Sequence, residues 1–150
     1  MVLKNDFRKA SLFVFFALAV MIPLSCSSVS KQKGEQEDLQ EIADAFNSAV
    51  RWSDFKTACG FVLPPRKQAF WDQMDEMSNT VRIMDFQIRE VSVPQKKNRG
   101  TVILRYRYYH MDSPNMRTKN LQQHWIFSEQ EKSWFVAEHN LQSLMEGKKK

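Results

Sequence analysis

The chain is poor in cysteine and contains no internal repeat, no second linker and no recognisable catalytic motif. Its two cysteines, Cys26 and Cys59, are too few for a scaffold held together by several disulfides. Its longest apolar run, Leu12 to Leu24, is shorter than the roughly 20 apolar residues that a membrane-spanning helix needs. The sequence therefore indicates where the protein goes more clearly than what it does.

The apolar run has the flanks of a secretory signal. Lys4, Arg8 and Lys9 precede it, and the small residue Ser25 follows it, directly before Cys26. A basic start, a short apolar core and a small residue before a cleavage point are typical of export signals. We expect export; an uncleaved anchor, or a cleaved signal followed by a coincidental cysteine, are the alternatives.

Residues 22–26, with the sequence IPLSC, resemble the lipobox of bacterial lipoproteins. Ser25 and Cys26 match that pattern, whereas Pro23 stands where the family usually has Leu. The resemblance implies that Cys26 is lipidated on sulfur, becomes the mature N-terminus and holds the protein on a membrane of the bacterial cell envelope. Ser27, in place of the Asp that retains some lipoproteins at the inner membrane, favours the outer membrane and a domain facing the periplasm.

These patterns divide the chain into four segments. We expect a lipoprotein signal peptide at residues 1–25, a flexible polar tether at 26–37, one folded domain at 38–145 and a basic tail at 146–150. If lipidation fails, a Cys26–Cys59 disulfide becomes possible. Otherwise we expect Cys59 to be buried as a small apolar residue.

The basicity of the chain comes from its two ends. The formal net charge is +5, yet residues 26–150 hold 19 Lys and Arg against 16 Asp and Glu, and three lysines at the C-terminus account for that difference. A nucleic-acid-binding domain needs a basic face. We therefore expect no nucleic-acid partner.

The first half of the domain has helical periodicity. Leu39, Ala43, Phe46 and Val50 belong to one apolar stripe, which predicts a long amphipathic helix. A second, short helix is expected to begin after Ser53 or Asp54, either of which can cap it. A third helix is expected from Pro65 to about Met77, with Phe70, Trp71, Met74 and Met77 buried.

From Val81 onward the period falls to two, which predicts four antiparallel strands. Phe86 and Ile88 alternate out of phase with Val91 and Val93, which indicates a bulge near residues 89–90. Turns are expected at 94–100, 112–115 and 129–132. The fold class is therefore α+β, with N-terminal helices packed on a curved four-strand antiparallel sheet.

Two stretches of this sequence resemble nuclear transport factor 2-like proteins: AVRWSDFKTA at 49–58, and QHW at 123–125 before KSWF at 132–135. The resemblance covers about residues 38–140. It implies a cone in which the bent sheet wraps the long helix and leaves a cavity at the open end. Ketosteroid isomerases and polyketide cyclases use that cavity, whereas other members bind or dimerise without catalysis, so the resemblance leaves the activity open.

Candidate catalytic groups have simpler explanations. Asp54 suits a helix cap, Tyr106 and Tyr108 suit a half-buried strand face, and His110 precedes a turn where we expect it to be exposed. We assign no catalytic residue and favour a non-catalytic protein, with an isomerase- or cyclase-type enzyme as the least favoured alternative. We also expect no metal or other cofactor, because His110, His124 and His139 lie on different predicted strands without nearby ligands.

Two non-catalytic roles remain. We favour a membrane-tethered interaction or accessory domain that forms a homodimer or binds an envelope protein, and the alternating Arg105, Arg107 and Tyr109 are the candidate interface. The alternative is a protein that binds a small apolar ligand in the cone. The candidate pocket residues for that role are aromatic: Trp52, Phe55, Tyr106, Tyr108 and Trp125.

Overall fold

The computed structural model describes residues 27–94 and 98–146. The predicted signal peptide, Cys26 and most of the basic tail lie outside the described residues, so those interpretations stay predictions. Residues 31–150 belong to one compact unit. None of the helices in the described part of the chain is both long enough and apolar enough to cross a bilayer.

The long helix α2, Ser27–Arg51, carries the predicted apolar stripe. Leu39, Ala43 and Phe46 are completely buried, while the acidic residues between them face solvent. α2 also includes residues 27–37, for which the sequence predicts a tether. Apart from Gly34 these residues tolerate a helix, and Lys33 pairs with Glu37 one turn along it.

Two further helices follow a tight turn. Asp54 caps α3, Phe55–Gly60, by accepting a hydrogen bond from the Thr57 backbone N–H at 3.1 Å, as predicted. The 3₁₀ turn η1, Pro64–Arg66, leads into α4, Lys67–Thr80. The prediction that Trp71 is buried is wrong: it is 40% exposed, because it lies about a quarter turn of α4 away from the buried face of Phe70, Met74 and Met77.

Four strands form one antiparallel sheet in the order β1-β2-β3-β4. They are β1 Val81–Ser92, β2 Arg99–His110, β3 Ser113–Ser128 and β4 Ser133–Glu138. The predicted bulge is confirmed by a register shift between Ile88 and Glu90, and a second shift lies between Ile83 and Asp85. The turn predicted at 112–115 is shorter, because His110 already pairs with Ser113.

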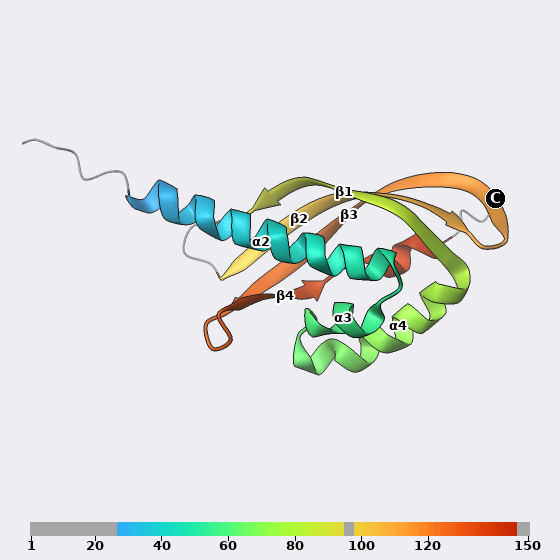
Figure 1. The fold of residues 1–150 in the computed structure, drawn as a ribbon, viewed down its shortest axis with the longest axis horizontal. Helices are drawn as coiled ribbons and strands as arrows, with labels where there is room; N and C mark the ends of the chain where they lie inside the picture. Colours follow the sequence, from blue (N-terminus) through green and yellow to red (C-terminus); the bar gives the residue numbers. More distant parts are fainter. Residues whose placement is uncertain (1–26, 95–97, 147–150) are drawn as a thin grey trace, which may run out of the picture. The chain divides into compact units, whose positions relative to one another are not determined.

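One face of the sheet, here called the inner face, packs against the helices. Val102, Leu104, Tyr106 and Tyr108 alternate with outward-pointing neighbours along β2, as predicted. Gly100 is required on this face, because a Cβ there would collide with the Leu39 side chain of α2. Figure 1 shows α2 running beside the sheet, with α3 and α4 alongside the C-terminal half of α2. The predicted fold class is thus confirmed.

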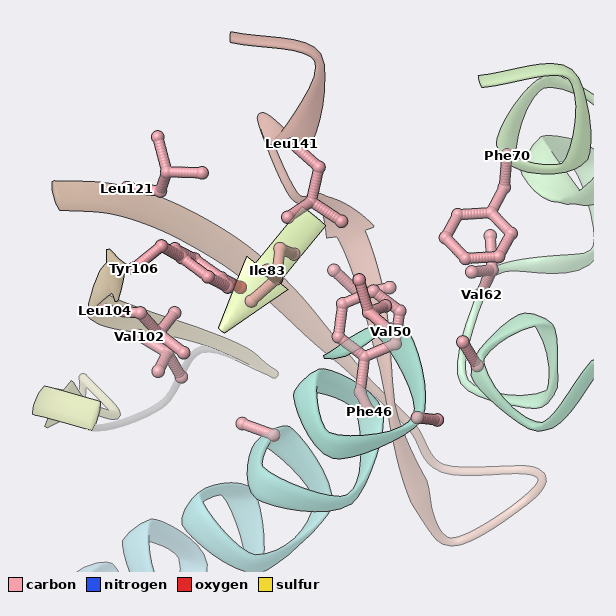
Figure 2. Packing of buried hydrophobic residues seen from close by; sticks show 14 of the residues in the cluster. Phe46, Val50, Val62, Phe70, Ile83, Val102, Leu104, Tyr106, Leu121 and Leu141 are labelled. Carbon is pink, nitrogen blue, oxygen red and sulfur yellow. The ribbon is translucent and has the colours of Figure 1, made fainter. Parts of the chain in front are cut away.

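The core lies between the sheet and these helices. Phe46 and Val50 point from α2 into this space, toward Val62 and Phe70 of the α3–α4 segment (Figure 2). Phe46 contacts Trp125 of β3 edge-on, with ring centroids 5.7 Å apart. Cys59 is buried and unpaired in this cluster, as expected of a small apolar residue.

A C-terminal strap, residues 139–145, turns back under the sheet after β4. Asn140 adopts left-handed backbone angles (φ 52°), which reverse the chain into the 3₁₀ turn η2, Leu141–Leu144. Leu141 and Leu144 are fully buried. The expectation that His110 is exposed is wrong, because the strap covers it and its Nε2 lies 2.9 Å from the Leu144 carbonyl oxygen.

Candidate functional site

The inner face of the sheet carries one polar cluster, formed by Asn47 of α2, Tyr106 of β2 and Gln123 of β3. All three side chains are fully buried. The Tyr106 hydroxyl donates to Asn47 Oδ1, and Gln123 Nε2 donates to the same oxygen at 2.8 Å. Asn47 Nδ2 donates in turn to the Ala43 carbonyl at 2.6 Å and to Gln123 Oε1 at 3.2 Å. The amide–phenol cluster satisfies its hydrogen bonds internally.

The chemistry of this cluster is that of neutral groups. Burial raises the pKa of Tyr106 far above its ordinary value of 10.0, so the phenol keeps its proton. Asn and Gln have no titratable proton to exchange. The cluster can donate and accept hydrogen bonds but lacks the carboxylate or imidazole that general acid–base catalysis uses.

Trp125 lies beside this cluster and is 1% exposed. Its indole Nε1–H is buried without a hydrogen-bond partner. A buried donor without a partner costs stability, and such a group is also where a buried acceptor would bind.

The five predicted pocket residues do not surround one hollow in the described structure. Trp52 is 74% exposed at the α2–α3 turn, where the Arg51 guanidinium stacks on its ring. Phe55 is half-buried, whereas Tyr106 and Tyr108 are packed into the core. Their shared role in a pocket stays a prediction.

The predicted interface residues lie together on the outer face of β2. Arg105 and Arg107 are exposed and Tyr109 is half-buried. Arg107 pairs in register with Asp85 of β1, and Arg105 pairs with Gln87. Their role in binding another chain stays a prediction.

The groups that the sequence raised as possible catalysts serve the fold. Hydrogen bonds from Thr57 lower the pKa of Asp54, which is fully committed as the α3 cap. His110 contacts the strap, and Arg117 approaches it at 3.4 Å. Among residues 27–94 and 98–146, no three His, Cys, Asp or Glu side chains gather in a way that would hold a metal ion.

A groove that the sequence did not predict lies between α4 and the strap. Its volume is about 510 Å³. The wall combines apolar and polar side chains: Val62, Pro65, Arg66, Ala69, Phe70, Gln73, Val136, Ala137, Glu138, His139, Asn140 and Gln142. Gln73 of α4 donates to the Gln142 side chain of η2, so a hydrogen bond joins the two sides of this Arg66 groove.

Two nitrogen-rich side chains define the polar part of the Arg66 groove. Arg66 Nη1 donates to the Ala137 carbonyl oxygen at 2.7 Å, which places the guanidinium at the end of β4. The His139 ring stands edge-on to Phe70, with ring centroids 5.5 Å apart. Burial, together with the positive charge of Arg66, lowers the pKa of His139 to about 4, so the ring is neutral at pH 7.

The tautomer of His139 follows from its neighbour. Its Nδ1 accepts a hydrogen bond from the Leu141 backbone N–H at 3.3 Å. A neutral ring whose Nδ1 accepts carries its proton on Nε2, so Nε2–H is the donor that remains.

A second hollow, of about 550 Å³, lies on the other side of Arg66. Arg99, Thr101 and His124 line it from the sheet, and it shares Arg66, Ala137 and Glu138 with the groove. The sequence did not pair Arg66 with His139, because they approach each other only where the segment before α4 packs against the end of β4: Val62 bridges to Val136, and Arg66 donates to Ala137.

The comparisons with known proteins concern the fold. No protein-family model and no curated protein matches the chain. Among solved structures, a ketosteroid isomerase-like protein from Erwinia carotovora atroseptica is similar over 70% of this chain and 92% of its own, with 16% identity and a TM-score of 0.56.

Two other solved structures are similar to the same extent. A putative dehydratase of the NTF2-like family from Streptomyces avermitilis covers 71% of this chain and 94% of its own, at 16% identity and a TM-score of 0.56. A protein of unknown function from Mycobacterium tuberculosis covers 77% and 75%, at 12% identity and a TM-score of 0.60. The chain therefore has the nuclear transport factor 2-like fold.

Proposed function

We propose that this chain is a lipid-anchored protein of the bacterial cell envelope whose domain binds another protein or a second copy through its surface. The observation that carries the proposal is the filled interior of the cone. Phe46, Tyr106 and Trp125 are each at most 1% exposed and occupy the space between α2 and the sheet. In the described part of the chain, the Trp125 Nε1–H is the buried side-chain donor without a partner, and the charged side chains lie on the outside.

The internal chemistry also supports a non-catalytic role. The amide–phenol cluster of Asn47, Tyr106 and Gln123 is neutral and uses its own members as partners. Proton transfer in the cone would need a group that titrates near neutral pH. The polar side chains of the described inner face that lie in this cluster do not meet that need.

The proposed anchor rests on the sequence pattern at residues 22–26. One acyl chain holds a protein only reversibly, because each buried methylene contributes about 0.8 kcal/mol, so a diacylated Cys26 is the form expected to give stable attachment. The anchor would keep the domain on the periplasmic side of the outer membrane.

The anchor is tested by mass spectrometry of the membrane fraction of the host. The expected N-terminal fragment begins at a diacylated Cys26, and Cys26→Ala should move the protein out of the membrane fraction. Cys59→Ala is the matched control, because it removes the other thiol and should leave the lipid in place. An unmodified Cys26 in the mature wild-type chain would overturn the anchor.

The surface role is tested on the outer face of β2. Arg105→Glu combined with Arg107→Glu reverses two exposed charges without touching the core. The double variant is expected to reduce the sedimentation coefficient, or to lose a crosslinked envelope partner. Arg89→Glu, on β1, is the control. Unchanged sedimentation and crosslinking in the double variant would count against this surface.

A second candidate function is the binding of a small apolar ligand in the cone. The unpartnered Nε1–H of Trp125 favours it, because an acceptor on such a ligand would satisfy that donor. Native mass spectrometry of protein purified from its host should then show a co-purifying small molecule, and Trp125→Phe should release it. Consistent absence of such a mass would exclude this candidate.

A further inference from the structure

The Arg66 groove has the composition of a ligand site and lies outside the filled cone. We propose that it binds a small amphipathic carboxylate, with the carboxylate on Arg66 and His139 and the apolar tail against Val62, Ala69 and Phe70. This inference is independent of lipidation at Cys26.

Arg66 is held in place before any ligand arrives. Its Nη1 is committed to the Ala137 carbonyl oxygen, and a guanidinium has four further N–H donors arranged in a planar fork. Within residues 27–94 and 98–146, no carboxylate lies within ion-pair distance of this guanidinium. A positioned guanidinium without an acidic partner favours a carboxylate, which matches its fork with two parallel hydrogen bonds.

His139 adds a second donor of fixed orientation. Its ring packs edge-on to Phe70, and its Nδ1 is occupied by the Leu141 N–H. Nε2–H is then the donor left for a ligand. A neutral donor such as the His139 ring adds a hydrogen bond for an anion without repelling the Arg66 guanidinium. An amine ligand is disfavoured here, because it would face hydrogen-bond donors from both residues and the positive charge of Arg66.

The rest of the groove suits a short apolar tail. Its volume of about 510 Å³ falls within the range of about 300–1,000 Å³ of small-molecule sites. Val62 and Phe70 form a buried floor, and Ala69 is an exposed small residue of α4 at the wall. Each methylene that enters such a site is worth about a three- to fourfold gain in affinity, so tail length should matter.

Glu138 provides a direct test of the charge of the ligand, because its own negative charge opposes a bound carboxylate. Its carboxylate also lines the groove and is exposed, so it repels a bound carboxylate through solvent. Glu138→Gln should therefore tighten binding of a carboxylate by about two- to fivefold. The same substitution would weaken binding of a cation.

The test is an NMR titration of the full-length chain with hexanoate, hexan-1-ol and hexylamine, read at the His139 ring nitrogens and the Arg66 guanidinium. Hexanoate should give saturable shifts at both side chains and raise the pKa of His139. The alcohol and the amine should bind at least tenfold more weakly. Butanoate should bind about tenfold more weakly than hexanoate, because two methylenes are lost.

Four variants complete the test. Arg66→Gln should weaken hexanoate binding by about ten- to a hundredfold, and Ala69→Trp should abolish it by filling the groove from an exposed position. Arg89→Gln and Gln68→Trp are the matched controls and should change nothing, since Arg89 is an exposed arginine that donates to Gln87, and Gln68 is exposed on α4 outside the groove. Equal binding of hexanol and hexanoate would overturn the proposal, as would hexanoate binding that survives both Arg66→Gln and Ala69→Trp.

Discussion

The hydroxyl group of Tyr106 allows a prediction in which the sign of a stability effect changes with pH. Tyr106→Phe removes one oxygen from the amide–phenol cluster and leaves the ring in place. Asn47 and Gln123 keep their mutual hydrogen bonds at 2.8 and 3.2 Å, so no buried amide is left without a partner. At pH 7 the variant loses two neutral hydrogen bonds, the one that the hydroxyl donates to Asn47 and the long one, 3.2 Å, that it accepts from Gln123. Because the second is weak and Gln123 keeps its bond to Asn47, the cost should be about 1 kcal/mol in the free energy of unfolding.

At alkaline pH the order of stability of the wild type and Tyr106→Phe is expected to reverse. Burial raises the pKa of Tyr106 in the folded state, whereas the unfolded chain ionises near 10.0. Above that pH the unfolded wild-type chain binds fewer protons than the folded chain, so wild-type stability falls as pH rises. At pH 11 this amounts to about 1.4 kcal/mol. Because Tyr106→Phe has no such proton to lose, it should become the more stable protein above about pH 10.7.

The assay is urea unfolding followed by tryptophan fluorescence at several pH values between 7 and 11. Tyr109→Phe is the control at pH 7, because Tyr109 lies on the outer face and its loss should cost less than about 0.5 kcal/mol. A difference between wild type and Tyr106→Phe that does not vary with pH would refute the view that the phenol is a neutral buried donor. A cost well above about 2 kcal/mol at pH 7 would refute the claim that the two amides satisfy each other.

Three further predictions concern other parts of the fold. The pKa of His139 is lowered from 6.5 to about 4 in the folded chain, so as pH falls the unfolded chain is protonated at this ring before the folded chain. The free energy of unfolding should therefore fall by about 2–4 kcal/mol between pH 6.5 and pH 4. His139→Phe should flatten that part of a urea-unfolding pH profile. Asp54→Ala should lower the midpoint of thermal unfolding because the Thr57 N–H loses its cap, whereas Asp54→Asn should retain most of the wild-type stability. Gly100→Ala should destabilise the domain in the same assay, because the added Cβ collides with the Leu39 side chain. In the double variant, Leu39→Ala should partly reverse the effect of Gly100→Ala. Strictly additive stability losses of the two substitutions would contradict the contact.

Local periodicity was enough to predict the fold. The stripe through Leu39 and Phe46 placed α2, and the alternation along β2 placed Tyr106 on the inner face, because both patterns repeat with the geometry of one element. The bulge at Ile88–Glu90 was visible as a change of phase. Trp71 was misplaced because it is apolar and three residues before Met74, although it lies at the edge of the buried face of its helix, beside Asp72.

The strap and the Arg66 groove depend on contacts between distant residues. His110 was expected at the surface, since nothing near it in the sequence indicates that Leu144 returns to cover it. The contact between His139 and Phe70 likewise joins residues that are far apart in the sequence, one after β4 and one on α4. A left-handed residue such as Asn140 is a weak signal by itself, because Asn also occurs in ordinary turns. Residues that meet only through tertiary structure leave no spacing pattern to read.

The hydrogen-bonding groups without partners are distributed unevenly between the interior and the surface, which bears on where we propose that the chain binds a ligand. Inside the cone the Trp125 Nε1–H has no partner, but a ligand that used the amides or the phenol of the cluster would first have to break the bonds that these groups make to one another. At the Arg66 groove, one guanidinium N–H is committed to the Ala137 carbonyl oxygen, so a ligand that used the other donors would not break that bond. Arg105 and Arg107 on the outer face are likewise exposed, so a partner could bind them without entering the interior. We therefore propose that a ligand breaks fewer of the protein's own hydrogen bonds when it binds at the surface of this chain than when it enters the cone.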